Sequence, residues 1–230
     1  MSKIKISIIS DSVSMPRECN GDNVYINETW SEILNNITGD KYRLYNFSAR
    51  SRTTNSLINS ELLHEAIELV NPDILIIQLG IVDCSPRIFS NFEKNIIFRS
   101  FFPKFLRLKI VDIRKRKNKV KNIKKYHLLV DHELFEKNLS TFLAKVKPKI
   151  KILLIPIIGD FNILNEFRPA YKNNIQEFNQ ILKSFKNDNI TFLDNIISKL
   201  EPEWFCKDGY HLSKIGHIEL SNIISKKLYV

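Results

Sequence analysis

The sequence predicts an α/β protein in which helices cover both faces of a five-stranded parallel sheet. Apolar stretches of strand length alternate along the chain with longer stretches of helical periodicity. This alternation is typical of strand–helix–strand units, whose crossovers leave neighbouring strands parallel. The chain has 230 residues, enough for one substantial core, and its 6 Gly and 8 Pro are too few for a low-complexity linker. We therefore expect a single three-layer α/β/α domain over 1–230.

Five stretches have the pattern of buried strands. The first, 3–9, alternates apolar and polar residues and becomes continuously apolar at its end. The strongest, 73–80, is a continuous apolar run that follows Pro72 and ends at Gly80. The other three strands are predicted over 43–48, 149–158 and 190–194.

Helical periodicity fills the gaps between these strands. In 27–37, Asn27 is a candidate cap for the first helix. In 54–70, the apolar residues fall on one side of a helix. Further helices are predicted over 132–146, 171–185 and 213–228, the last despite Gly216. In such folds ligands bind beyond the carboxyl ends of the strands, so the functional residues should follow the strands.

The segment 91–131 interrupts this alternation and is predicted to be a basic helical insertion. From Lys94 to Lys125 it contains 13 Lys and Arg against one acidic residue, whereas the whole chain has a net charge of +10. The positive charge is therefore local. It suits a solvated helix, or a surface that binds anionic membrane lipid or an anionic glycan. Nucleic acid is disfavoured as a partner, because no recognised nucleic-acid-binding fold accompanies the charge.

The cysteines and the N-terminal residues bear on the compartment. Cys19, Cys84 and Cys206 lie far apart, without the spacing of a metal site. Such a sparse, odd count predicts reduced thiols. The first residues alternate instead of forming the apolar core of a signal peptide, and no apolar run reaches the length of a membrane span. We expect a cytoplasmic protein, free or peripheral to the inner membrane, with no metal or organic cofactor.

Residues from opposite ends of the chain form a candidate catalytic triad. Ser12 follows the first strand, and Asp208 and His211 are three residues apart just before the last helix. An aspartate at this spacing can hold one imidazole nitrogen, which leaves the other free to take the serine proton. The serine would then attack a carbonyl carbon and form an acyl-enzyme. Each motif alone is weak, because a serine after a strand is usually a turn residue. Their joint occurrence carries the hypothesis.

Four short motifs, in order, resemble those of the SGNH/GDSL hydrolase family. Ser10-Asp11-Ser12 stands where the family has Gly-Asp-Ser, which aligns Ser12 with the nucleophile. The other three motifs are "NFSARSRTT" (46–54), "GIVDC" (80–84) and "DGYH" (208–211), of which the last matches fully. The resemblance covers nearly the whole chain. It implies the flavodoxin-like fold of that family and a serine esterase, deacetylase or O-acetyltransferase.

The resemblance also implies how the oxyanion is stabilised. In the family a glycine of the second motif donates its backbone N–H, and Ser51 holds that position here. The family's third motif contributes an asparagine, which Val82 replaces. Losing one such donor costs roughly 10²–10³ in turnover. Three explanations stay open: Arg50, Arg52 or Arg87 supplies another donor, the enzyme is slow on an activated acyl donor, or the site is not catalytic.

Other residues of these motifs suggest a substrate. Asp83 is expected at the oxyanion and substrate site, where it would hold the loops by hydrogen bonds, and Arg87 either binds a substrate anion or lies at the surface. "SDSVSMPR" (10–17) and "GIVDCSPR" (80–87) resemble a subgroup found with bacterial surface-polysaccharide biosynthesis genes. That resemblance implies a carbohydrate ester, with acetyl as the acyl group. The rival hypothesis is a non-catalytic protein that binds a glycan or a partner on a degenerate SGNH scaffold.

Overall fold

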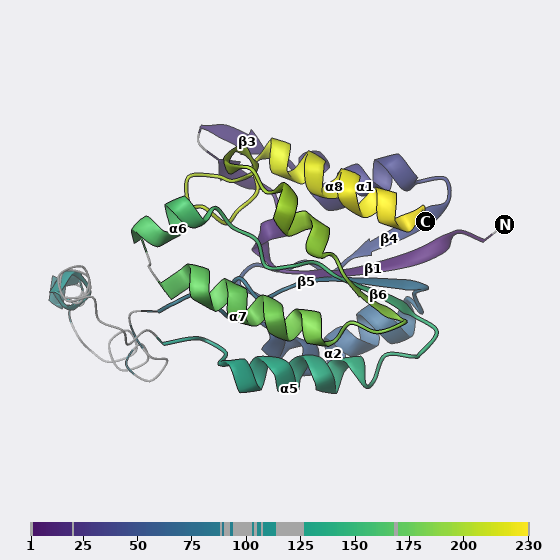
Figure 1. Cartoon of the computed structure of the whole chain (residues 1–230), viewed down its shortest axis with the longest axis horizontal. Coiled ribbons are helices and arrows are strands. Elements are labelled where there is room, and N and C mark those ends of the chain that lie inside the picture. The colour runs from purple at the N-terminus through teal and green to yellow at the C-terminus, as the bar shows by residue number, and fades with distance from the viewer. Residues whose placement is uncertain are drawn as a thin grey trace.

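A five-stranded parallel sheet forms the centre of the protein (Figure 1). The computed structural model describes residues 2–19, 21–87, 127–167 and 170–229, together with 89, 93, 103, 105–106 and 108–113. The strands are β1 (Ile4–Ser10), β4 (Tyr42–Asn46), β5 (Ile74–Gln78), β6 (Lys151–Leu154) and β7 (Ile190–Phe192). Their order is β4-β1-β5-β6-β7, and all neighbouring strands are parallel. The predicted fold class is confirmed.

The two central strands are continuously apolar because both of their faces are covered. Ile6 and Ile8 of β1 and Leu75 and Ile76 of β5 are completely buried, and Ile8 lies directly opposite Ile76. At the edge of the sheet, β4 has buried and exposed residues mixed. A parallel sheet covered on both faces loses the period-two pattern in its central strands, as observed here.

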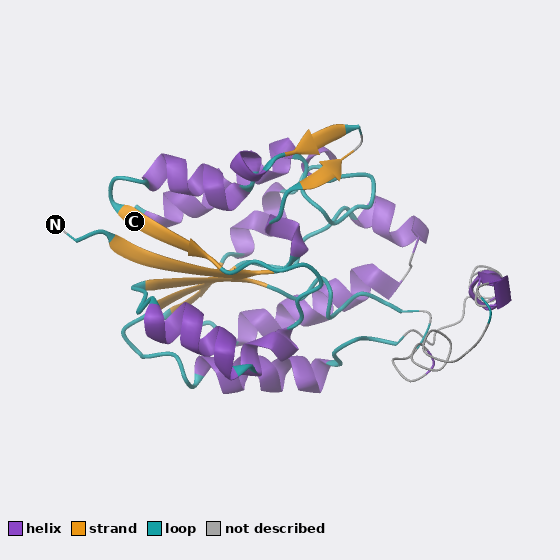
Figure 2. Ribbon diagram, turned by 180° about the vertical axis from the view of Figure 1, so that it is seen from behind, coloured by secondary structure: helices purple, strands orange, loops and turns teal. Residues whose placement is uncertain are grey.

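Helices cover the two faces of the sheet, which gives the predicted three layers (Figure 2). One face carries α1 (Trp30–Thr38) and α8 (Lys214–Leu228), and the other carries α2 (Ser60–Leu63), α5 (His132–Leu143) and α7 (Ala170–Ser184). Each helix buries large side chains against the sheet. They include Trp30 and Leu34 of α1, Phe135 and Phe142 of α5, and Phe178 of α7, all of which are fully buried.

The helix predicted over 54–70 is divided into three short helical segments. These are η3, a 3-10 helix (Thr54–Ile58), then α2, then η4, a wider helix of the π type (His64–Leu69). The break between η3 and α2 falls at Asn59, whose side chain accepts a hydrogen bond from the Glu61 N–H and caps α2, whereas α2 passes directly into η4. The predicted cap Asn27 lies inside a 3-10 turn, η2 (Ile26–Glu28), and α1 begins after Thr29. The periodicity located the apolar face, whereas local hydrogen bonds set the breaks.

Several short elements were not predicted, because segments of three to seven residues leave little pattern in a sequence. They are η1 (Ser12–Ser14), β2 (Arg17–Cys19), β3 (Asp22–Val24), α6 (Phe161–Phe167), η5 (Asp194–Lys199) and η6 (Pro202–Trp204). The strands β2 and β3 pair antiparallel and form a separate two-stranded hairpin.

A disulfide joins Cys19 of β2 to Cys206, 187 residues away in the sequence. Cys84 is a free, buried thiol. The prediction of reduced cysteines is therefore wrong for this pair. The fold brings β2 beside the segment that precedes α8, and no sequence spacing could indicate that contact. The cytoplasmic location stays a prediction.

The predicted basic insertion at 91–131 falls mostly outside the described residues. Within it, 108–113 are helical. Arg87, which precedes this segment, pairs with His127: the backbone N–H of Arg87 donates to the His127 carbonyl, and that of His127 donates to the Arg87 carbonyl. The roles considered for 94–125 stay predictions. Across the described ranges, no helix combines the length and apolarity that spanning a membrane requires.

Candidate active site

The turn after β1 presents Ser12 at the carboxyl edge of the sheet. The side chain of Asp11 accepts a hydrogen bond from the Val13 N–H at 2.9 Å, which starts the one-turn helix η1. Ser12 Oγ lies 3.1 Å from His211 Nε2. Ser14, two residues on, is buried and has other partners: its hydroxyl reaches the Asp11 carbonyl and the Ser48 hydroxyl. Ser12, and not Ser14, therefore faces the imidazole.

A tight turn before α8 holds Asp208 against His211. Asp208 Oδ1 accepts hydrogen bonds from the backbone N–H groups of Tyr210 and His211, and Asp208 Oδ2 lies 2.6 Å from His211 Nδ1. Between them Gly209 has a φ of +79°, a conformation that favours glycine. The structure thus brings Ser12, His211 and Asp208 together in one hydrogen-bonded chain, with the imidazole in the middle.

The surroundings set the charge states of this pair. Burial opposes ionisation of Asp208, but hydrogen bonds from the His211 side chain and from the backbone outweigh it and lower the pKa of Asp208 to about 2. Burial also lowers the pKa of His211 below its usual 6.5. Asp208 opposes that effect, and the cations Arg17 and Arg50 add to it. At neutral pH the pair is therefore a carboxylate and a neutral imidazole, the form that a general base requires.

Arg17 is a further partner of the triad that had no role in the sequence-based hypothesis. Its Nη1 lies 3.3 Å from Asp208 Oδ2 and 2.7 Å from His211 Nδ1. When Nε2 accepts the Ser12 proton, Nδ1 carries the imidazole hydrogen and donates it to Asp208. A guanidinium can only donate, so Arg17 forms no hydrogen bond with a protonated Nδ1 and affects the imidazole through its charge. Its hydrogen bond goes to Asp208.

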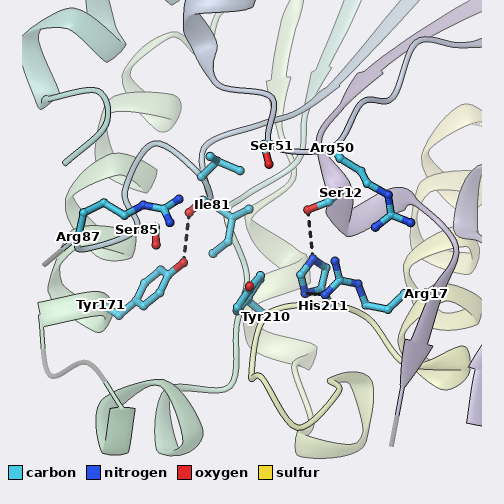
Figure 3. A pocket seen from close by; sticks show the side chains of 11 residues that line it. Ser12, Arg17, Arg50, Ser51, Ile81, Ser85, Arg87, Tyr171, Tyr210 and His211 are labelled. Atoms are coloured by element: carbon cyan, nitrogen blue, oxygen red, sulfur yellow. Dashed lines mark hydrogen bonds between the residues drawn. The ribbon is translucent and has the colours of Figure 1, made fainter. Parts of the chain in front are cut away.

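A pocket of about 240 Å³ opens beside Ser12 (Figure 3). Its lining comes from the turns after β1, β4 and β5, from β2, from the start of α7 and from the turn before α8. The residues are Ser12, Arg17, Arg50, Ser51, Ile81, Val82, Ser85, Arg87, Tyr171, Tyr210 and His211. The predicted Ser12, His211, Ser51, Arg50 and Arg87 are among them, and Asp208 lies behind His211. Tyr210 belongs to the predicted "DGYH" motif, whereas nothing in the sequence marked Tyr171, which donates to the Ile81 carbonyl.

Two residues bear on how an oxyanion could be bound. Ser51 has a φ of +57°, which residues with a side chain rarely adopt, so its backbone has the conformation typical of a glycine. Ser51 and Ser12 both line the pocket (Figure 3). Val82 also lines the pocket and brings no side-chain donor there. Arg52 donates to the Phe47 carbonyl and does not line the pocket.

Asp83 lies away from the pocket, although it was expected at the oxyanion and substrate site. It is completely buried, and its Oδ1 accepts hydrogen bonds from both the backbone N–H and the hydroxyl of Thr54, at 2.9 and 2.6 Å. Burial raises the pKa of Asp83 to about 6. Its contacts join the loop after β5 to η3, so it acts on the pocket by holding the loops in place.

The other titratable groups nearby are explained by packing. His217 is buried in α8, its Nδ1 accepts a hydrogen bond from the Trp30 N–H, and burial lowers its pKa to about 3. Burial raises the pKa of the Cys84 thiol well above its usual value, so it stays protonated and a poor nucleophile. Within the described ranges, no cluster of three His, Cys, Asp or Glu side chains is placed to hold a metal ion.

Solved structures of several ester-cleaving enzymes share this fold. A lipase/acylhydrolase from Enterococcus faecalis has a TM-score of 0.62 at 15% identity, over 98% of this chain and 95% of that one. A catalytic mutant of Axe2, an acetylxylan esterase from Geobacillus stearothermophilus, has a TM-score of 0.58 at 16% identity, over 98% of this chain and 94% of that one. The lipase Lip_vut3 from a goat rumen metagenome has a TM-score of 0.59 at 14% identity, over 97% of each chain. No family model and no curated protein match the sequence. At these identities the comparison shows the fold.

Proposed function

We propose that this protein is a serine-dependent ester hydrolase of the SGNH/GDSL type, with Ser12, His211 and Asp208 as its catalytic triad. The observation that carries the proposal is the chain of contacts from Ser12 Oγ through both imidazole nitrogens to Asp208. The catalytic mutants of Axe2 replace a serine, an aspartate and a histidine, and that aspartate precedes the histidine by three residues. Asp208 precedes His211 by the same interval.

The geometry supports a two-step reaction. His211 Nε2 takes the proton of Ser12 as its oxygen attacks the ester carbonyl carbon, and Asp208 stabilises the imidazolium that forms. His211 then gives this proton to the leaving alcohol, and the acyl group stays on Ser12. In the second step His211 activates a water molecule, which attacks the acyl-enzyme and releases the acid and free Ser12. If a sugar hydroxyl takes the place of water, the same steps transfer the acyl group.

Backbone donors are the proposed oxyanion site. The glycine-like backbone of Ser51 supports its N–H as one donor, and the N–H of Ser12 is the other. The Val82 side chain supplies no donor, so we expect slower turnover than with a third donor, by roughly 10²–10³. Arg50 and Arg87 line the pocket, and either of them could offset part of this loss.

The substrate that we propose is a carbohydrate ester, with acetyl as the acyl group. A pocket of about 240 Å³ has room for a small acyl group and part of a sugar, and Tyr171 and Tyr210 give it aromatic walls. Axe2, which shares the fold, is an acetylxylan esterase. The resemblance of "SDSVSMPR" and "GIVDCSPR" to proteins of surface-polysaccharide biosynthesis points to a glycan of that kind.

Hydrolysis of p-nitrophenyl acetate tests the proposed function. The wild-type protein should release p-nitrophenol faster than buffer, and Ser12→Ala should reduce the rate to that of buffer. Ser14→Ala is the matched control, because Ser14 follows the same strand and its hydroxyl has other partners. It should retain the wild-type rate. Equal rates for wild type and Ser12→Ala, with both proteins folded, would favour the non-catalytic glycan- or partner-binding protein.

A further inference from the structure

We propose that the sugar ester cleaved at Ser12 carries an anionic group, a carboxylate or a phosphate, and that Arg87 binds this group at the side of the pocket away from the triad. This inference rests on the proposed function and names the substrate class of the same site. It follows from the charge of the pocket lining, from the partners of each arginine, and from the placement of Arg87 relative to Ser12.

The pocket has a strong excess of positive charge. Its described lining holds three arginines and no aspartate or glutamate. Arg17 comes from β2, Arg50 from the loop after β4 and Arg87 from the loop after β5, so three separate elements direct a cation to one cavity. A solvated basic face on one helix would not explain this convergence. Guanidinium groups converge in this way where a carboxylate or phosphate is recognised.

The three arginines differ in their partners. Arg17 forms an ion pair with Asp208 and thus belongs to the triad. Arg50 donates to the Pro16 carbonyl, which leaves its charge uncompensated, but its side chain is exposed to solvent. The buried Nε atoms of Arg17 and Arg87 both lack a hydrogen-bond partner, but Arg87 also forms no ion pair with a carboxylate in the described part of the chain. Arg87 is therefore the cation of the pocket whose bonding capacity is least used.

The backbone fixes the position of Arg87. Its N–H and carbonyl are both hydrogen-bonded to His127, at 2.8 and 3.0 Å, so the base of the side chain is held. Figure 3 shows its guanidinium beside Ser85 and Tyr171, on the opposite side of the pocket from Arg17 and His211. Partial burial of an unpaired cation costs free energy unless an anion pairs with it. An anion there would leave the sugar between Arg87 and Ser12.

The buried carboxyls of Asp11 and Asp83 have partners other than the pocket arginines. Burial raises the pKa of Asp11 to about 7, so this carboxyl is only partly ionised near neutral pH, and it raises the pKa of Asp83 to about 6, so Asp83 is mostly ionised there. Asp83 is already bonded to Thr54, and Asp11 accepts a hydrogen bond from Val13. Neither of these two carboxyls is therefore a partner of Arg87, and a ligand anion can take that place.

Calorimetric titration of the full-length Ser12→Ala protein tests this inference without turnover. The ligands are methyl glucuronoside, glucose 1-phosphate and methyl glucoside at low salt, and they separate a carboxylate, a phosphate and a neutral sugar. At least one anionic sugar should bind ten times more tightly than methyl glucoside. The stronger of the two identifies the anion. Added salt should weaken its binding, because a guanidinium–anion contact is electrostatic.

Variants in the Ser12→Ala background locate the anion. Arg87→Gln should lower the affinity for the anionic sugar about tenfold and leave the affinity for the neutral sugar unchanged. Arg87→Lys keeps the charge but loses the paired donors, so its affinity for the anionic sugar should lie between those of the Ser12→Ala parent and Arg87→Gln. Arg43→Gln, an exposed arginine of β4 outside the pocket, is the matched control and should bind like its parent.

Three results would overturn the inference. They are equal binding of neutral and anionic sugars, no binding of either anion, and unchanged anion binding in both Arg87 variants. Thermal unfolding followed by circular dichroism verifies that each variant is folded. The p-nitrophenyl acetate assay on wild-type protein reports the proposed function separately, so failure of one proposal is distinguishable from failure of the other.

Discussion

At the scale of single residues, Ser12 and Ser14 show what sequence can and cannot indicate. Both follow β1, and the resemblance to Gly-Asp-Ser already favoured Ser12 over Ser14. The hydroxyl contacts agree, since only that of Ser12 meets the imidazole. Arg17 could not be predicted in the same way. Its place beside Asp208 depends on two three-residue strands and on a disulfide between cysteines 187 residues apart, which leave no periodic pattern.

The contact of Arg17 with the His–Asp pair predicts a pH dependence. Activity needs a neutral His211, so kcat/KM should rise with pH through the pKa of His211 and then level off. Burial, assisted by Arg17 and Arg50, lowers that pKa, so the midpoint should lie below 6.5. In Arg17→Gln the loss of a nearby cation makes the protonated imidazole less unfavourable. The pKa of His211 then rises, and the midpoint moves to higher pH.

A pH–rate profile with p-nitrophenyl acetate measures this effect. Arg43→Gln, which removes a charge of the same sign far from the site, should keep the wild-type midpoint. A purely structural role for Arg17 would lower the rate at every pH and leave the midpoint in place. That outcome, or a wild-type midpoint above 6.5, contradicts the electrostatic role.

At the scale of elements, the disulfide joins two parts of the candidate active site. Cys19 ends the strand that carries Arg17. Cys206 precedes the Asp208–His211 turn, and its N–H donates to the His211 carbonyl at 2.8 Å. The Gly209 N–H donates back to the Cys206 carbonyl. One covalent bond thus holds the arginine-bearing hairpin against the turn that carries the histidine and the aspartate.

Removing this bond should loosen both parts. We expect the Cys19→Ser/Cys206→Ser double variant to lose about 2–4 kcal/mol of unfolding free energy, and kcat to fall with it. Urea unfolding and the ester assay measure the two effects. A thiol reductant should reproduce both in the wild-type protein and leave the double variant unaffected, which serves as the control. If the wild-type protein kept its stability and rate after verified reduction, the disulfide would have no part in organising the site.

The predicted elements differ from the observed ones where residues are buried but are not paired with a neighbouring strand. The strand expected over 149–158 ends at Leu154, although Ile155, Ile157 and Ile158 are buried beyond it. Apolar residues reveal burial, and only the neighbouring strands decide where the ladder ends. Gly216 lies within a helix that was predicted despite this glycine, and the structure shows why a glycine is there. A Cβ there would lie 2.2 Å from the Trp204 carbonyl, so this glycine allows the close approach of α8 to η6.

At the scale of the whole molecule, the order of the parallel strands brings together the segments that line the pocket. The turns after β1, β4 and β5 meet at one edge of the sheet, and the turn before α8 reaches the same place (Figure 1). This much was predictable, because parallel strands share their carboxyl edge. The chemistry of the pocket was less so. Its arginines come from three separate elements, and only the folded chain shows that they face one cavity.

The central claim is that Ser12 is a nucleophile activated by His211, and covalent labelling tests it most directly. The full-length protein is incubated with a fluorophosphonate probe, and the modified peptide is identified by mass spectrometry. We expect one adduct, on Ser12, that is absent in Ser12→Ala, much slower to form in His211→Ala and unchanged in Ser14→Ala. Folded wild-type protein without an adduct on Ser12, or labelling that is equally fast in His211→Ala, would contradict the account.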